Sequence, residues 1–187
     1  MGAALRGGGP HRAASAFTAA NVLTALRLAS VPFFAAAIVH GAIVAACALY
    51  ALAVATDFFD GRVARLRGEA TSFGGLLDHA SDALFVTAGL GALAWHGAVP
   101  APLPFLVPAA FLQYVLDSRA HAGKRLRASR LGRYNGIAYF ALVAAPLVRD
   151  LCGLAWPAPE VVRALGWALV ATTALSMLDR LAASTRP

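Results

Sequence analysis

The stretch from residue 57 to residue 82 reads DFFDGRVARLRGEATSFGGLLDHASD, with long apolar segments before and after it. It holds Asp57, Asp60, Asp78 and Asp82, although the whole chain has only nine acidic residues among 187. Carboxylates are costly at the edge of apolar segments unless a cation compensates them. Two aspartates at each end of one short polar stretch therefore indicate a functional site.

The composition of the chain indicates a membrane protein. The residues are 59% hydrophobic and 13% charged, and the mean hydropathy is +0.67, which argues against a water-soluble domain with a polar surface. A helix needs about 20 mostly apolar residues to cross a bilayer. We therefore predict an all-α fold, an integral membrane bundle of six transmembrane helices, over residues 17–39, 42–59, 73–95, 103–120, 132–150 and 160–182.

These six segments occupy most of the chain, so we predict one compact membrane domain over residues 17–187. Residues 1–16 are rich in glycine and alanine and are interpreted as a flexible or interfacial cytosolic N-terminal tail. The two cysteines, Cys47 and Cys152, fall far apart in the sequence, and we expect neither a disulfide framework nor a zinc site.

Basic residues are distributed unequally between the predicted loops, and the net charge is +7. The positive-inside rule places both termini and the loops at 60–72 and 119–133 in the cytosol, at the cell (inner) membrane. The opposite side has only Arg149 and Arg163. A basic cytosolic face can hold anionic lipid headgroups or phosphorylated solutes. Nucleic acid is not an expected partner, because no RNA- or DNA-binding module is recognisable.

The spacing of the aspartates places them on two helix faces. Residues three or four apart share one face of a helix, so Asp57 and Asp60 point together, as do Asp78 and Asp82. Two adjacent antiparallel helices would direct four carboxylates into one cleft, where a cation must balance them. Carboxylates without cysteine or suitably spaced histidine favour magnesium or manganese. His79 points about 100° away from Asp78 and is interpreted as a neighbour.

Small residues accompany the aspartates on the same faces. Gly61 and Ala64 follow Asp60, and Gly74 precedes Asp78 by one helical turn. Small side chains leave room for a ligand or for the close approach of a neighbouring helix. Ordinary helix packing would explain any one of them, but together with four aspartates they favour a binding cleft.

Residues 57–82 fit the pattern DxxDGxxARx8GxxxDxxxD at every specified position: Asp57, Asp60, Gly61, Ala64, Arg65, Gly74, Asp78 and Asp82. This pattern resembles the signature of the CDP-alcohol phosphotransferase (CDP-alcohol phosphatidyltransferase) family. The NVLTALR stretch at 21–27 is similar to the start of the first helix in that family.

The resemblance implies a function and a set of roles. An acceptor hydroxyl would attack the β-phosphorus of a CDP-alcohol, with CDP-diacylglycerol as the expected donor, and CMP would be released. Two divalent cations, magnesium or manganese, would be held by Asp57, Asp60, Asp78 and Asp82, with Asp82 also the general base. Gly61, Arg65 and Thr71 would contact the CDP part, and Ala64 and Gly74 would leave room for it. A homodimer and contacts with membrane lipids are also expected.

The acceptor is open from the sequence. Arg130 and Arg133, in SRLGRYNG, can bind an acceptor phosphate, which favours a small hydroxylated acceptor such as glycerol 3-phosphate or inositol phosphate. The RLASVPFF stretch at 27–34 loosely resembles phosphatidylglycerophosphate synthases. LLDHASDAL departs from their usual DPxADK at His79, Ser81 and Ala83, however.

Two other interpretations compete with the enzyme. Carboxylates in membrane helices often mark the ion path of a transporter or channel, but such a path predicts ionisable groups through the midplane rather than near one face. An inactive family member acting as a scaffold is disfavoured because all four aspartates are present.

Overall fold

A computed structural model describes residues 19–67, 72–117 and 130–184 of the chain, and within them every regular element is a helix. The prediction of an all-α fold with six helices is confirmed. The helices are α1 (Ala19–Val39), α2 (Ile43–Arg67), α3 (Ser72–Trp95), α4 (Leu103–Asp117), α5 (Arg130–Cys152) and α6 (Pro159–Ser184). The predicted N-terminal tail, residues 1–16, lies outside the described residues.

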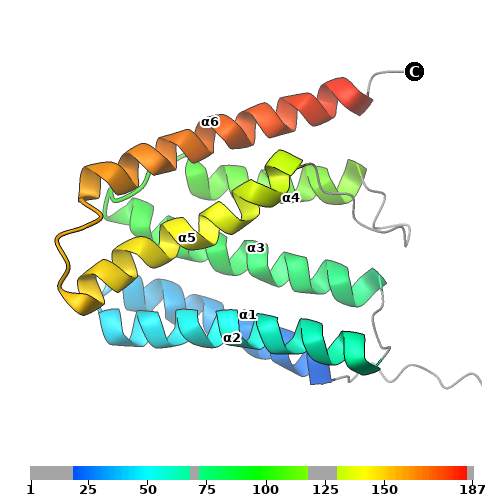
Figure 1. The fold of residues 1–187 in the computed structure, drawn as a ribbon, viewed down its shortest axis with the longest axis horizontal. Coiled ribbons are helices and arrows are strands. Elements are labelled where there is room, and N and C mark those ends of the chain that lie inside the picture. The colour runs from blue at the N-terminus through cyan, green and yellow to red at the C-terminus, as the bar shows by residue number, and fades with distance from the viewer. Residues whose placement is uncertain (1–18, 68–71, 118–129, 185–187) are drawn as a thin grey trace, which may run out of the picture.

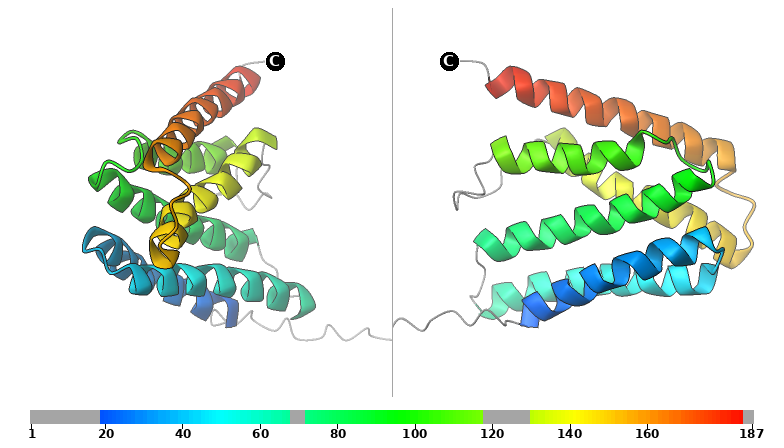
Figure 2. Two further views of the ribbon diagram at one scale, coloured as in Figure 1. Left: turned by 60° about the vertical axis from the view of Figure 1, so that its left-hand side comes forward. Right: turned by 180° about the vertical axis from the view of Figure 1, so that it is seen from behind.

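The six helices form one bundle in which α3 holds the central place. Helix α3 packs against α1, α4 and α5, while α2 contacts α1 and α5, and α6 contacts α4 and α5. Consecutive helices run in opposite directions (Figures 1 and 2). As a result, the end of α2, the start of α3, the end of α4 and the start of α5 all lie at one end of the bundle.

Tight turns connect the helices at the opposite end. Gly41 follows α1 and Gly97 follows α3, each with φ of 68°. Residues other than glycine rarely adopt this backbone conformation. The amide of Ala42 donates to Ala37 O, and the amide of Ala98 donates to Leu93 O, at 2.9 Å or less. These bonds satisfy carbonyls at the helix ends and fix the antiparallel pairs.

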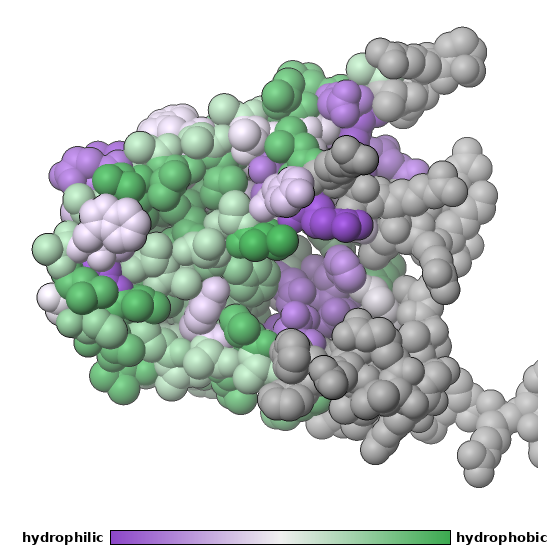
Figure 3. All heavy atoms as spheres, in the orientation of Figure 1, coloured by the Kyte–Doolittle hydropathy of each residue, from purple (hydrophilic) through white to green (hydrophobic). Residues whose placement is uncertain are grey.

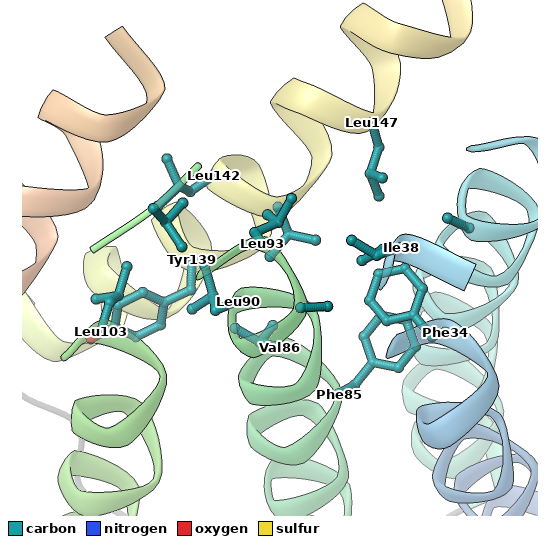
Figure 4. Packing of buried hydrophobic residues seen from close by; sticks show 14 of the residues in the cluster. Phe34, Ile38, Phe85, Val86, Leu90, Leu93, Leu103, Tyr139, Leu142 and Leu147 are labelled. Atoms are coloured by element: carbon teal, nitrogen blue, oxygen red, sulfur yellow. The ribbon is translucent and has the colours of Figure 1, made fainter. Parts of the chain in front are cut away.

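The core lies where α3 meets its neighbours. The rings of Phe34 from α1 and Phe85 from α3 are both fully buried and stack with centroids 4.3 Å apart. Further along α3, Leu90 and Leu93 belong to the same buried cluster as Leu142 and Leu147 from α5 (Figure 4). This packing fixes the position of α1 against α3. It therefore also fixes the side chains that these two helices carry at the end of the bundle opposite the tight turns, which we call the open end.

The outer surface of the bundle is largely apolar. Phe33, Phe105 and Trp167 are more than half exposed, as are many leucines. In the space-filling view, hydrophobic side chains cover most of the visible surface, and hydrophilic ones gather in a hollow near the end that carries the start of α5 (Figure 3). The surface is suited to contact with lipid.

Two of the described helical segments, Leu131–Cys152 and Pro159–Ala182, are long and apolar enough to cross a membrane. The apolar segments Leu23–Val39, Ile43–Asp57 and Leu103–Asp117 are shorter. Six membrane crossings therefore stay a prediction. Helix α2 continues to Arg67, eight residues beyond its predicted apolar segment, since no proline or glycine pair interrupts the helical pattern after Asp57.

Candidate active site

Three of the four predicted aspartates come together at the open end of the bundle. Asp57 lies on α2, and Asp78 and Asp82 lie one turn apart on the facing side of α3. One carboxylate oxygen from each residue lies within 4.8 Å of the others. The spacing of four residues on α3 and the antiparallel packing of the helices thus produce the acidic cluster, which we define as Asp57, Asp78 and Asp82.

Arg27 of α1 reaches into the acidic cluster and contacts all three carboxylates. Its Nη1 atom donates to Asp82 Oδ1 at 2.7 Å and to Asp78 Oδ1 at 3.0 Å, and its Nη2 atom donates to Asp57 Oδ1 at 3.4 Å. The side chain of Arg27 is only 1% exposed. A buried guanidinium is stabilised by such carboxylate partners, and it compensates part of their mutual repulsion.

Arg27 is a site residue to which the aspartate pattern does not point, because it lies on another helix. Arg27 lies on the face of α1 that also carries Thr24, Ser30 and Phe34, all of them buried. A single arginine on the buried face of an apolar helix is expected to have a partner with a function, and this was the available signal. Its partner Ser81 is fully buried and accepts from Nη1 at 3.0 Å, so the serine that departs from the DPxADK sequence takes part in holding Arg27.

A cavity of about 640 Å³ adjoins the acidic cluster and is lined by α2 to α6. Asp57 and Asp82 belong to its wall. In Figure 3 the hydrophilic side chains of this region are seen in the hollow. The polar lining consists of Asp57, His79, Asp82, Gln113, Tyr114, Arg133, Asn135, Tyr139, Thr173, Ser176 and Arg180.

Two arginines from different helices contribute to the cavity wall. Arg133, near the start of α5, is one of the residues predicted to bind an acceptor phosphate. Arg180, on α6, is the second. Its guanidinium lies 5.0 Å from the centre of the Tyr114 ring and 3.8 Å from Asp117 Oδ2, both on α4. These contacts fix the direction of the Arg180 side chain.

Hydrogen-bonding groups of α4, α5 and α6 line part of the cavity. Tyr139 of α5 and Thr173 of α6 share a short hydrogen bond between their hydroxyls, and Asn135 Nδ2 lies 3.5 Å from the same Thr173 oxygen. Gln113 of α4 donates to the carbonyl of Met177 on α6 at 2.9 Å. Buried polar groups of this kind are suited to a hydroxylated ligand, because both donors and acceptors are at hand.

Several predicted site residues are not placed by the structure. The side chains of Asp60, Gly61, Ala64 and Arg65 on α2, and that of Arg130 at the start of α5, lie outside the described part of the chain. Thr71 lies outside the described residues altogether. Gly74 is the third residue of α3, lies about one turn before Asp78 and is half-buried. His79 hydrogen-bonds with the carbonyl oxygen of its own helix at Gly75 and stays outside the acidic cluster.

The donor set of the acidic cluster fits a hard divalent cation. All three ligating groups are carboxylates with oxygens close enough to share one ion, and the nearby His79 ring is engaged elsewhere. Oxygen-only coordination favours magnesium or manganese over zinc or copper. The charge of the described side chains favours a cation as well, since three carboxylates surround one guanidinium.

Comparison with known proteins places the chain in a family. Over 87 residues it is 41% identical to a probable phosphatidylglycerophosphate synthase of Mycobacterium tuberculosis, and the match covers 43% of this chain and 42% of that relative's length. Over 160 residues it is 31% identical to a cardiolipin synthase (CMP-forming) of Streptomyces coelicolor, covering 81% of this chain and 73% of the relative. Residues 17–178 match the CDP-alcohol phosphatidyltransferase family, and the chain belongs to that family.

Proposed function

We propose that the protein transfers a phosphatidyl group from a CDP-alcohol, CDP-diacylglycerol, to the hydroxyl of a phosphorylated polyol such as glycerol 3-phosphate, with release of CMP. Inositol phosphate is the alternative acceptor. The named relatives make different lipid products, so similarity leaves the acceptor open. The family membership and the two long apolar helices together indicate a membrane protein of phospholipid synthesis.

One observation carries the proposal: the acidic cluster and two arginines border the same cavity. Asp57 and Asp82 contribute carboxylates to one part of the wall, and Arg133 and Arg180 contribute guanidinium groups to another. A cation-binding part suits the pyrophosphate of a CDP-alcohol, and arginines suit an acceptor phosphate. The cavity volume of about 640 Å³ is within the range of small-molecule sites.

The chemistry assigned to the chain's residues is proton transfer and positioning. In the reaction the acceptor oxygen bonds to the β-phosphorus, the bond from that phosphorus to the oxygen of CMP breaks, and CMP leaves with the electron pair. The carboxylate of Asp82 takes the acceptor's hydroxyl proton. Divalent cations, when bound by Asp57, Asp60, Asp78 and Asp82, supply compensation for the charge of the phosphates. Arg27 holds Oδ1 of Asp82, which orients this carboxylate at the cavity wall.

The family pattern suggests the remaining roles. Gly61, Arg65 and Thr71 are proposed to contact the CDP part, with Ala64 and Gly74 leaving room for it. Arg130 and Arg133 are proposed to bind the acceptor phosphate, and Arg180 joins them because it borders the same cavity. A guanidinium offers two parallel donors to a phosphate, which gives direction as well as charge.

The proposed membrane placement follows from charge. Basic residues are concentrated beyond the helix ends that carry the acidic cluster, and the opposite end has only Arg149 and Arg163. The positive-inside rule then places the site at the cytosolic side of the cell (inner) membrane, with six crossings. The homodimer expected from the resemblance stays a prediction.

The test is CMP release by the purified protein in liposomes that contain CDP-diacylglycerol and magnesium or manganese. A panel of acceptors separates the possibilities: glycerol 3-phosphate, inositol phosphate, unphosphorylated glycerol and inositol, and phosphatidylglycerol. We expect CMP release with a phosphorylated polyol and little with its unphosphorylated form. Release only with phosphatidylglycerol would overturn the proposed acceptor class, and ion flux without CMP release would favour the channel interpretation.

A further inference from the structure

The charge balance of the acidic cluster is set by a residue outside the family's aspartate pattern. Arg27 lies 30 residues before Asp57 and more than 50 before Asp78 and Asp82, yet it bonds all three carboxylates. Among the contacts of the described residues, one guanidinium faces the three carboxylates of the acidic cluster. Arg27 is thus a permanent counter-ion on a site that also attracts exchangeable cations.

The position of Arg27 allows both kinds of cation to be present together. Asp57 and Asp82 belong to the cavity wall, whereas Arg27 is absent from the described lining. Its side chain is 1% exposed, against 47% for Asp57 and 26% for Asp82. The guanidinium therefore approaches the carboxylates from the protein side, and ligands arrive from the cavity side.

The backbone around Arg27 keeps it in this place. Ser30 donates to the carbonyl of Arg27 at 2.7 Å, and two turns later Phe34 stacks on Phe85 of α3. Ser81 accepts from Nη1 and donates to the carbonyl of Asp78 at 2.7 Å, which ties Arg27 to the helix that carries two of the aspartates.

We infer that Arg27 is a positioning residue that holds Asp57, Asp78 and Asp82 together when no divalent cation is bound, and that its charge weakens the binding of that cation. The inference rests on the proposed function, which supplies the divalent cation. The rings of Phe34, Tyr50 and Phe85 join α1, α2 and α3, so the three helices stay together without the guanidinium, and Arg27 sets only the separation of the carboxylates that they carry. Loss of the positive charge then outweighs loss of order, because charges a few ångströms apart interact strongly near a protein surface.

Arg27→Gln tests this directly, since glutamine keeps hydrogen-bond donors but removes the charge. Mn²⁺ binding to the full-length protein in nanodiscs is measured by the electron paramagnetic resonance of free Mn²⁺. We expect Arg27→Gln to bind Mn²⁺ about tenfold more tightly or better, while CMP release falls. Arg27→Lys keeps the charge and should bind Mn²⁺ close to the unchanged protein.

Arg163→Gln is the matched control. Arg163 lies on α6 and donates to the carbonyl of Gly97 at 2.8 Å, in a turn at the other end of the bundle. The same loss of charge there should leave Mn²⁺ affinity unchanged. Equal or weaker Mn²⁺ binding by Arg27→Gln, when the unchanged protein binds the ion, would overturn the inference alone. No Mn²⁺ binding by the unchanged protein would overturn the proposed function and the inference with it.

A second variant applies if Arg27→Gln does not fold in the absence of metal. The double variant Arg27→Gln/Asp78→Asn removes one charge of each sign. Thermal unfolding in EDTA should then occur at a higher temperature than for Arg27→Gln, because the remaining carboxylates repel less. A double variant no more stable than the single one would contradict the counter-ion role.

Discussion

Replacing Asp82 with asparagine is expected to stop turnover while leaving the fold intact. Asparagine has nearly the same shape but neither the charge nor the ability to take a proton. The loss of the proposed general base costs about 10² to 10⁴ in rate, and loss of a charged ligand for the cation adds to it. We therefore expect CMP release to fall by at least a hundredfold.

The stability cost of Asp82→Asn follows from the contacts that remain. Arg27 keeps Asp78 and Ser81 at 3.0 Å and Asp57 at 3.4 Å, and the asparagine oxygen still accepts from Nη1. One charge-assisted bond becomes an ordinary one, a loss of about 1 kcal/mol. Thermal unfolding should therefore move by only a few degrees.

The assay is CMP release from CDP-diacylglycerol in proteoliposomes, with binding of the CDP-lipid measured in parallel. Asp150→Asn is the matched control, because Asp150 is exposed, lies at the other end of α5 and pairs with its neighbour Arg149. A partly exposed pair of this kind contributes little, so CMP release should not change. Asp82→Asn activity within tenfold of the unchanged protein, or an equal loss in Asp150→Asn, would refute the assignment.

Three further substitutions test the cavity and the core. Arg180→Gln should lower kcat/KM for a phosphorylated acceptor about 10- to 100-fold, because it removes a charge-assisted hydrogen bond to the acceptor phosphate. Mn²⁺ binding should change little. An unchanged kcat/KM would show that Arg180 does not contact the acceptor. Gly136 lines the cavity, and a Cβ added to it would meet nothing within 4 Å. Gly136→Phe should reduce kcat/KM for the acceptor about tenfold or more, and full activity would show that the acceptor binds elsewhere. Gly89→Ala should lower the free energy of unfolding by about 1–3 kcal/mol, because its Cβ would lie 2.8 Å from the ring of Phe34. Gly91→Ala is the control and should be neutral, because its Cβ would meet nothing within 4 Å. Equal thermal stability of the two variants would contradict the described packing.

The part of the site that could be predicted from sequence is the part set by local helix geometry. The spacing of Asp78 and Asp82 places them on one face of α3, and the antiparallel course of α2, which packs with α3 on α1, brings Asp57 to them. Both steps need only the helical period and a short connection. The six helices themselves were also predictable, because apolar segments separated by polar ones indicate them directly.

The residues that sequence reasoning missed depend on packing between distant segments. Arg27 reaches the aspartates only because Phe34 and Phe85 fix α1 against α3, and Arg180 borders the cavity only because α6 packs on α4 near Tyr114. Neither arginine is near the aspartate pattern in the chain. In a membrane helix, however, a lone arginine on the same face as buried residues is a usable signal, and Arg27 satisfies it.

The most direct test of the account is the metal dependence of CMP release by the purified chain in liposomes with CDP-diacylglycerol and the preferred acceptor. We predict no release after treatment with EDTA, full recovery on adding magnesium or manganese, and no recovery in the Asp57→Asn and Asp78→Asn variants. CMP release that persists in EDTA, or that these two variants retain, would contradict the claim that gathered carboxylates hold the cations required for the reaction.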